Sequence, residues 1–211
     1  SDDTGNGKVD CDDDTCKNSL ICRTEKPKLV EAFIMSQCPY GVQAVNAMKE
    51  VLQATKGQLK FDVHFIADKT EAGFNSLHGQ PEVDENIRML CVKKLYPANN
   101  KWLDYYWCRF TGDDWRGTEW KKCATCGIDA GKVEACFNGE GKKLLEEDIK
   151  IAKALDITGS PTWLANNKHK FHGIAASAVQ TNVCQHNAGL VGCDKKLAAP
   201  AAAPPSGSCG N

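Results

Sequence analysis

One cysteine of the chain stands where the backbone can activate it. Cys38 directly precedes Pro39 in the run Cys-Pro-Tyr-Gly, and proline is favoured at the first position of a helix. A cysteine just before a helix meets unpaired backbone N–H groups and the positive end of the helix dipole, which stabilise its thiolate. The sequence therefore predicts that Cys38 is a nucleophile towards disulfides, with Pro39 and Tyr40 in contact with its substrate.

The residues around Cys38 predict the elements that position it. Apolar, β-prone residues over 28–34 indicate a strand. A helix is expected from Pro39 to about Ala54, because apolar side chains recur there at steps of three and four residues. Alternating apolar residues over 60–66 predict a second, half-buried strand. The main domain is thus expected to open with a β-α-β unit.

The later part of the chain changes from helical to hairpin patterning. Apolar residues follow helical periodicity over about 82–155, which predicts a helical insertion. Two short segments, 162–164 and 170–172, flank Asn166-Asn167, and asparagine tolerates the left-handed geometry of hairpin turns. Ser177 begins a capping-box pattern that predicts the start of a last helix.

This order of elements resembles an α/β thioredoxin-like fold with a helical insertion. In such proteins a cis-proline packs beside the active cysteine, and the backbone before it pairs with the substrate chain. The run Gly-Ser-Pro-Thr at 159–162 stands at the matching place. The resemblance therefore implies a cis Ser160-Pro161 bond, a role for Pro161 in shaping the site, and a role for Ser160 in binding substrate.

Residues 76–91 resemble a more specific family signature, C-Q-H-G-x2-E-C-x2-N-x4-C. The matching residues are His78, Gly79, Glu82, Asn86 and Cys91. That signature is typical of the gamma-interferon-inducible lysosomal thiol reductase (GILT) group, and the resemblance extends over residues 29–193. It implies a thiol-disulfide oxidoreductase that acts on protein thiols or disulfides without an organic cofactor. His78 is expected to contact substrate.

The sequence departs from this family at two places. The two further signature cysteines would fall at Ser76 and Val83, and their joint absence suggests that they pair in the family. The second cysteine of a C-x-x-C motif, which resolves the mixed disulfide with substrate, is replaced by Gly41. Three outcomes stay open: an external thiol resolves Cys38, another cysteine of the chain resolves it, or the site is redox-silent.

Twelve cysteines among 211 residues indicate a disulfide-rich protein of an oxidising compartment, either secreted and extracellular or periplasmic. If Cys38 is free, one further cysteine must be unpaired or bonded between chains, and Cys209 near the C-terminus is the natural candidate. Cys123-Ala-Thr-Cys126 is either a second redox pair or two structural cysteines in separate bridges. The second interpretation is favoured, because no strand leads into this motif.

The charge pattern excludes some partners. The formal net charge is -1, from 26 basic and 27 acidic side chains without a long block of either sign. The sequence therefore predicts no basic surface of the kind that binds nucleic acid. No stretch reaches the roughly 18 apolar residues that a membrane span needs. Neither nucleic acid nor a membrane span is expected.

Residues 2–13 resemble an EF-hand-type calcium loop with glycine at its sixth position. The expected Ca²⁺ ligands are Asp2, Thr4, Asn6, the Lys8 carbonyl, Asp10 and Asp13. Thr4 and Asn6 replace carboxylates, and Asp13 replaces the longer bidentate glutamate, so a modest, extracellular-type affinity is expected. A solvated acidic tail is the alternative.

Three segments are therefore expected. Residues 1–27 form an acidic, cysteine-rich appendage, and residues 28–193 form the thioredoxin-like domain. Residues 194–211 form an Ala/Pro-rich tail with too few apolar side chains to become ordered by itself. Contact with a neighbouring subunit would hold such a tail in place, so self-association through this tail is expected.

Two functions remain in view. One is a secreted thiol-disulfide oxidoreductase with a single cysteine in its active-site motif, which predicts a reactive Cys38. The other is a redox-silent thioredoxin-like module, a subunit of an extracellular assembly, which predicts an inert or bridged Cys38. The retention of Cys38 at a helix N-terminus favours the first function by a small margin.

Overall fold

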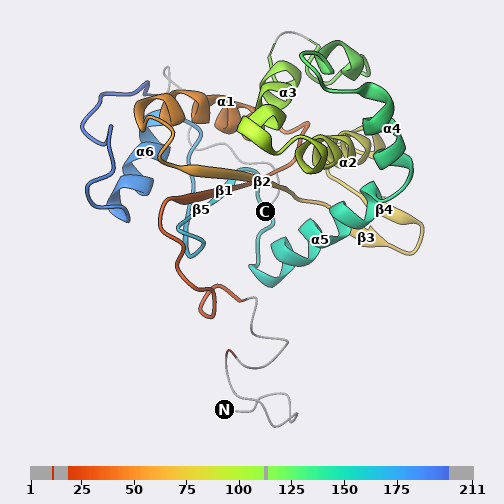
Figure 1. Ribbon diagram of the computed structural model, residues 1–211. Coiled ribbons are helices and arrows are strands. Elements are labelled where there is room, and N and C mark those ends of the chain that lie inside the picture. Colours follow the sequence, from red (N-terminus) through yellow and green to blue (C-terminus); the bar gives the residue numbers. More distant parts are fainter. Residues whose placement is uncertain (1–10, 12–18, 112–113, 200–211) are drawn as a thin grey trace.

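A computed structural model describes residues 11, 19–111 and 114–199 (Figure 1). The helices and strands are β1 (Leu29–Ile34), α1 (Pro39–Ala54), β2 (Lys60–Phe65), β3 (Asp68–Thr70), β4 (Gly73–Asn75), α2 (Gln80–Leu95), α3 (Lys101–Arg109), α4 (Ala130–Asn138), α5 (Gly141–Ala154), β5 (Thr162–Ala165), β6 (His169–Phe171) and α6 (Ala176–Gln185). Short 3₁₀ turns cover Ala98–Asn100 and Trp120–Cys123. The fold is mixed α/β, as the sequence predicts.

The central sheet has the strand order β2-β1-β5-β6. Strand β1 pairs in parallel with β2 and antiparallel with β5, and β5 pairs antiparallel with β6. The predicted β-α-β unit and the predicted hairpin are both confirmed. At the hairpin turn, Asn166 and Asn167 have φ values of 54° and 65°, in the left-handed region that asparagine tolerates.

Both faces of the sheet are covered, so its central strands are buried. Val30, Ala32 and Ile34 of β1 belong to the large core cluster, which also contains the buried side chains of α1 and α6. Phe33 lies in a second, smaller cluster with residues from the end of α5. Helices α1 and α6 lie on one side of the sheet and α5 on the other (Figure 1). This alternation of burial along β1 follows from the alternating direction of strand side chains.

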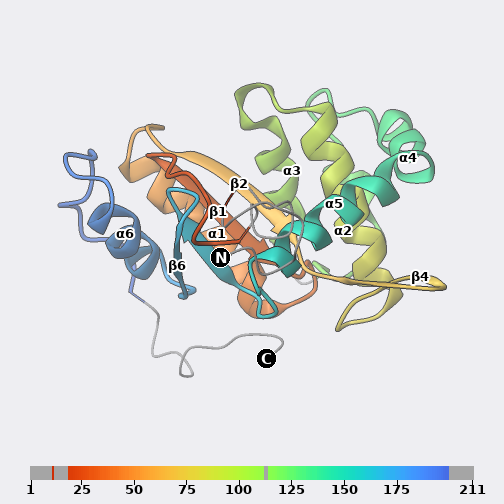
Figure 2. The same cartoon turned by 90° about the horizontal axis from the view of Figure 1, so that it is seen from below.

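The predicted helical insertion is confirmed as helices α2 to α5, which lie together beside the sheet, away from β6 and α6 (Figure 2). Its packing rests partly on two disulfides, Cys91–Cys136 and Cys108–Cys123. Both bridges begin and end within the insertion. Three of the four aromatic side chains of α3, Trp102, Tyr105 and Tyr106, are buried in its core, and Trp107 is partly buried.

The segment over 19–26 packs on the turn between β5 and β6. The Arg23 guanidinium donates to the side-chain oxygen of Asn167, and the Thr24 carbonyl accepts from the Asn167 amide. The Asn166 amide donates to Glu25. The Cys11–Cys22 disulfide closes a loop in the same part of the chain. The asparagines of the predicted turn therefore also anchor the approach to β1.

Two details of the prediction need correction or addition. Helix α6 begins at Ala176 with Ala175 as its N-cap, so Ser177 lies inside the first turn and is not the cap. The antiparallel hairpin of β3 and β4 is an addition to the predicted elements. None of the helices in the described ranges is long and apolar enough to cross a membrane.

Candidate active site

Cys38 is the N-cap residue of α1, with φ -80° and ψ 120°, and Pro39 opens the helix. The Val42 N–H donates to the Cys38 carbonyl at 3.0 Å, which is the first hydrogen bond of the helix. The Cys38 side chain is fully buried. Its Sγ lies 3.4 Å from the Ser160 carbonyl oxygen, and the Ser160-Pro161 bond is cis. The predicted meeting of the cysteine and a cis-proline is confirmed.

Cys38 takes part in a disulfide bond. Of the other described cysteines, eight pair with one another and Cys126 is free. Cys126 is exposed and free, whereas Cys209, the predicted unpaired cysteine, lies outside the described residues. Cys123 is bonded to Cys108, so Cys123 and Cys126 do not form a redox pair in this structure. The favoured interpretation, two cysteines in separate bridges, is correct for Cys123 and wrong for Cys126.

Neighbouring atoms fill the space that the side chain of a resolving cysteine at position 41 would need. A Cβ atom added at Gly41 would lie 2.5 Å from Ser160 Oγ and 3.2 Å from both Ile34 Cβ and the Met35 carbonyl oxygen. Ser160 Oγ in turn accepts a hydrogen bond from the Met35 N–H at 2.9 Å. The serine before the cis-proline thus occupies space that a side chain at position 41 would need.

The loop between β1 and α1 is held by side chains of the helical insertion. The Ser36 N–H donates to Asn86 Oδ1 at 3.2 Å, and the Gln37 N–H donates to Glu82 Oε2 at 2.8 Å. The Arg116 guanidinium donates twice to the Gln37 carbonyl, at 2.7 and 3.1 Å. Both peptide groups of Gln37, directly before Cys38, are therefore fixed.

The side chain of Glu82 is fully buried, and its carboxylate accepts hydrogen bonds from several donors. Ser76 Oγ donates to Glu82 Oε1 at 2.5 Å, and His78 Nδ1 lies 2.8 Å from Glu82 Oε2. Because a carboxylate only accepts, this ring nitrogen acts as the donor. The structure thus places His78, predicted as a substrate contact, against Glu82. Tyr40, predicted for the same role, packs against the apolar cluster that contains Cys38.

A cavity of about 380 Å³ lies beside this loop. Met35, Ile66, Ala152 and Ile157 supply apolar walls, and Ser76 and Leu77 line another part. Leu77 is 60% exposed, an unusual degree for leucine in this chain. The cavity therefore offers an apolar surface next to the residues that hold Cys38.

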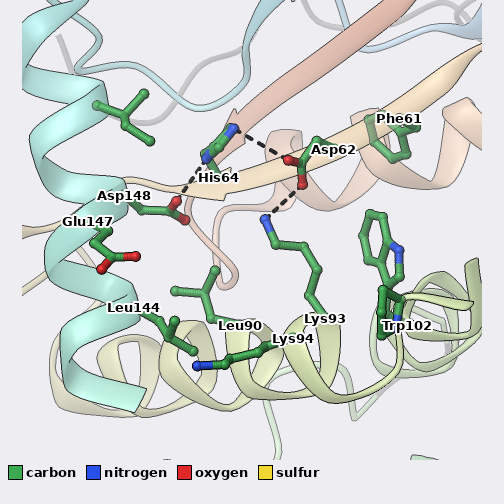
Figure 3. A pocket seen from close by; sticks show the side chains of 12 residues that line it. Phe61, Asp62, His64, Leu90, Lys93, Lys94, Trp102, Leu144, Glu147 and Asp148 are labelled. Carbon is green, nitrogen blue, oxygen red and sulfur yellow. Dashed lines mark hydrogen bonds and ion pairs between the residues drawn. The ribbon is translucent and has the colours of Figure 1, made fainter. Parts of the chain in front are cut away.

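A larger cavity of about 500 Å³ lies between β2, α2 and α5 (Figure 3). On its wall His64 Nδ1 contacts Asp148 Oδ1 at 2.8 Å, and Lys93 contacts Asp62 at 2.7 Å. Burial of His64 opposes its charge, but the Asp148 carboxylate and hydrogen bonds to Asp148 and Glu31 prevail and raise its pKa to about 9. The charges on this wall are therefore largely paired within the protein.

Sequence reasoning missed part of this arrangement. The signature match marked His78, Glu82 and Asn86, which recur every four residues; Glu82 and Asn86 share one face of α2, and His78 lies just before the helix. That spacing is a usable signal for a common contact. Arg116 and the side-chain role of Ser160 carry no such signal, because both contacts depend on tertiary packing.

The predicted calcium ligands cannot be placed in this arrangement. Asp2, Thr4, Asn6, Lys8, Asp10 and Asp13 lie outside the described residues. Over 19–111 and 114–199, together with residue 11, no group of three or more His, Cys, Asp or Glu side chains is arranged to hold a metal ion.

Several solved structures have a fold similar to that of this chain. A thioredoxin-like oxidoreductase from Silicibacter pomeroyi DSS-3 has a TM-score of 0.58 at 16% identity, covering 76% of this chain and 87% of its own. DsbA from Mycobacterium tuberculosis has a TM-score of 0.56 at 17% identity, covering 81% and 88%. BdbD from Bacillus subtilis has a TM-score of 0.55 at 15% identity, covering 75% and 86%. The chain therefore has a thioredoxin-like fold.

A narrower likeness comes from the sequence. Residues 29–126 match the family model of gamma interferon inducible lysosomal thiol reductase (GILT). The chain is thus GILT-like over the segment that carries Cys38, the signature residues and the first half of the insertion. No curated protein matches the chain. The disulfides among its described residues are typical of a protein of an oxidising compartment.

Proposed function

We propose that this chain is a thiol-disulfide oxidoreductase that acts on protein disulfides, with Cys38 as its nucleophile. The observation that carries the proposal is the position of Cys38. It caps the N-terminus of α1, where thiolates are stabilised, and its sulfur contacts the carbonyl before the cis-proline.

The reaction proceeds by two exchanges. The Cys38 thiolate attacks one sulfur of a substrate disulfide, so a mixed disulfide forms and the other substrate sulfur leaves as a thiolate and takes up a proton. A second thiolate then attacks Cys38 Sγ, forms a disulfide with it and releases the reduced substrate. One molecule of a small external thiol, such as glutathione, then forms a mixed disulfide with the enzyme and frees one enzyme thiol. A second molecule displaces the first as glutathione disulfide and frees the other enzyme thiol.

The second thiolate comes from another cysteine of the chain in this proposal. Gly41 has no thiol, and Cys38 is already bonded within the chain. The cysteines outside the described residues are Cys16 and Cys209. Leu20 packs against the apolar cluster that contains Cys38, and Cys16 stands only four residues before it, so we expect Cys16 to resolve Cys38.

The substrate surface is proposed to be apolar. The cavity beside Met35 and Ser76, together with exposed Leu77, can receive an apolar side chain next to the substrate cysteine. Oxidised proteins that expose such side chains when they unfold fit this surface. The proposed location is a secretory or extracellular compartment.

The test measures the rate at which the protein reduces the disulfides of insulin, a model protein substrate. Glutathione supplies the electrons, and the reduced insulin chains are the product. Cys38→Ser is expected to lower the rate by about a hundredfold or more, because the nucleophile is lost. The matched control is Cys126→Ser, which removes the exposed free thiol and is expected to leave the rate unchanged. Cys16→Ser is expected to slow turnover, and Cys209→Ser is not. A wild-type rate no higher than that of glutathione alone contradicts the proposal.

A second candidate is supported by the burial of Cys38 and by its bond. In this proposal the domain is a redox-silent subunit of an extracellular assembly, with Ca²⁺ bound by residues 2–13 and self-association through residues 194–211. The potential of the Cys38 disulfide distinguishes the two, because structural disulfides are typically reduced only below about -300 mV. Sedimentation with Ca²⁺ or a chelator then tests assembly and its calcium dependence.

A further inference from the structure

Every backbone amide of the loop before α1 has an acceptor, and most of these acceptors are side chains from distant parts of the chain. The pairs are Met35 N to Ser160 Oγ (2.9 Å), Ser36 N to Asn86 Oδ1 (3.2 Å), Gln37 N to Glu82 Oε2 (2.8 Å) and Cys38 N to the Met35 carbonyl (3.1 Å). Most protein hydrogen bonds of a backbone amide go to another backbone group. The geometry of this loop is therefore imposed by the helical insertion and by the cis-proline segment.

Glu82 is the centre of this arrangement. Its carboxylate is completely buried, and a buried charge is tolerated only when donors surround it. Ser76 Oγ, His78 Nδ1 and the Gln37 N–H supply those donors at 2.5, 2.8 and 2.8 Å. His78 and Ser76 thus orient the carboxylate. In this orientation Glu82 Oε2 accepts a hydrogen bond from the N–H of Gln37, the residue before Cys38.

We propose that Glu82, oriented by His78 and Ser76, is a positioning residue for Cys38. It fixes the peptide group before Gln37, while Arg116 fixes the one after it. The chain then enters α1 with the sulfur at the helix N-terminus. Pro39 has no N–H, so the stabilising amides begin at Tyr40, and a small rotation of the loop moves the sulfur away from them. This inference rests on the proposed role of Cys38 as the reactive thiol.

The sign of the effect separates positioning from a simple effect of charge. A negative charge near Cys38 disfavours its thiolate, so loss of the charge alone makes Cys38 react faster. Loss of the held amide makes it react more slowly. Glu82→Ala removes both the charge and the acceptor, whereas Glu82→Gln removes the charge and keeps an oxygen that can accept from the Gln37 N–H.

The experiment measures alkylation of Cys38 in the reduced full-length chain as a function of pH, with peptide mapping to locate the label. At about pH 6, Glu82→Ala is expected to slow alkylation of Cys38 by about tenfold or more, and Glu82→Gln is expected to restore most of the rate. The midpoint of the pH–rate profile should move upward in Glu82→Ala. A merely structural role of Glu82 would leave this midpoint in place in the folded protein.

The matched control is Asp148→Ala, which removes a buried carboxylate with the same kinds of partner, a histidine and a backbone amide, outside this loop. It is expected to leave the profile of Cys38 unchanged. If Glu82→Ala does not fold, Asn86→Ala removes the acceptor of the Ser36 N–H in the same loop without changing any charge, and it is expected to slow alkylation as well. Unchanged or faster alkylation in Glu82→Ala, or in Asn86→Ala when it takes that place, overturns the inference. Because alkylation needs no turnover, loss of insulin reduction with these shifts intact would contradict the proposed function alone.

Discussion

Two regions of this protein use the same chemical unit for different ends. In each, a histidine Nδ1 lies 2.8 Å from a carboxylate that also accepts a backbone N–H at 2.8 Å. Beside the larger cavity the unit is His64, Asp148 and the Phe65 amide, and it ties α5 to β2. Beside Cys38 it is His78, Glu82 and the Gln37 amide, and it ties α2 to the loop before α1.

The surroundings of the two histidines differ. His64 has a side-chain exposure of 10% and faces Asp148, Glu31 and Asp62. His78 has a side-chain exposure of 23% and faces Glu82. The first unit joins two regular elements, so its loss should weaken the fold. The second unit ends on a loop that leads into the nucleophile, so its loss should change reactivity. Whether this histidine–carboxylate–amide unit affects stability or reactivity therefore depends on whether its backbone amide belongs to a strand or to the loop before Cys38.

The largest expected effect is on stability. Asp148→Ala leaves His64 and the Phe65 N–H without their buried acceptor, and breaking a buried pair in this way costs about 3–5 kcal/mol. Denaturant unfolding with disulfides intact measures this loss. The comparison fails if the unfolding free energy of Asp148→Ala equals that of the wild type.

The next effect concerns pH. The pKa of His64 is raised to about 9, above the usual value of 6.5, so the folded state holds this proton more tightly than the unfolded state. The resulting stabilisation, about 3 kcal/mol, is fully present below about pH 6.5 and is lost as the pH rises through about 9. Unfolding free energies from pH 6 to 10 should show this decline, and Asp148→Asn should reduce it. A flat profile in the wild type would contradict it.

A smaller effect is expected at Gly41. The added methyl group of Gly41→Ala approaches Ser160 Oγ too closely, and such overpacking costs about 1–3 kcal/mol. Ser160→Ala removes the clash but also the acceptor of the Met35 N–H. A double-mutant cycle should therefore show that Gly41→Ala costs less in the Ser160→Ala background. Additive effects would show that the two positions do not compete for space.

The smallest effect is expected at Ser76. Ser76→Ala removes one donor to Glu82 but leaves His78 and the Gln37 amide in place. A single lost hydrogen bond to a charged group costs about 1.5 kcal/mol. The rate of Cys38 alkylation should fall less than in Glu82→Ala. An effect as large as that of Glu82→Ala would mean that Ser76 alone orients the carboxylate.

Local chemistry explains which parts of the fold were predictable. Pro39 opens α1, Asn166 and Asn167 make the hairpin turn, and apolar periodicity marks β1, β2 and the insertion. Each of these signals acts over a few residues. The β3–β4 hairpin was missed because its strands have three residues each and β3 is exposed, so it has no apolar pattern.

The sequence predicted those parts of the site in which a single residue sets the local backbone conformation. Cys38 at a helix N-terminus and the cis bond before Pro161 follow from the sequence and its likeness to thioredoxin-like proteins. The contacts of Glu82 with Gln37 and of Arg116 with the same residue join segments far apart in the chain. Parity named Cys209 as a second unpaired cysteine only if Cys38 is free, and Cys209 lies outside the described residues. That Cys126 is free among the described residues had no signal in the sequence, because pairing depends on which cysteines the folded chain brings together.

The placement of two disulfides bears on the order in which the chain folds. Cys91–Cys136 and Cys108–Cys123 lie wholly within the insertion, whereas the sheet is completed only when Val30 of β1 meets Ala165 of β5. Closing a long loop costs more entropy than closing a short one, and distant pairings slow folding. The insertion can oxidise before the sheet closes, and its cross-links then shorten the loop that β5 must bridge. Oxidation of the insertion therefore prepares the pairing that brings Pro161 to Cys38.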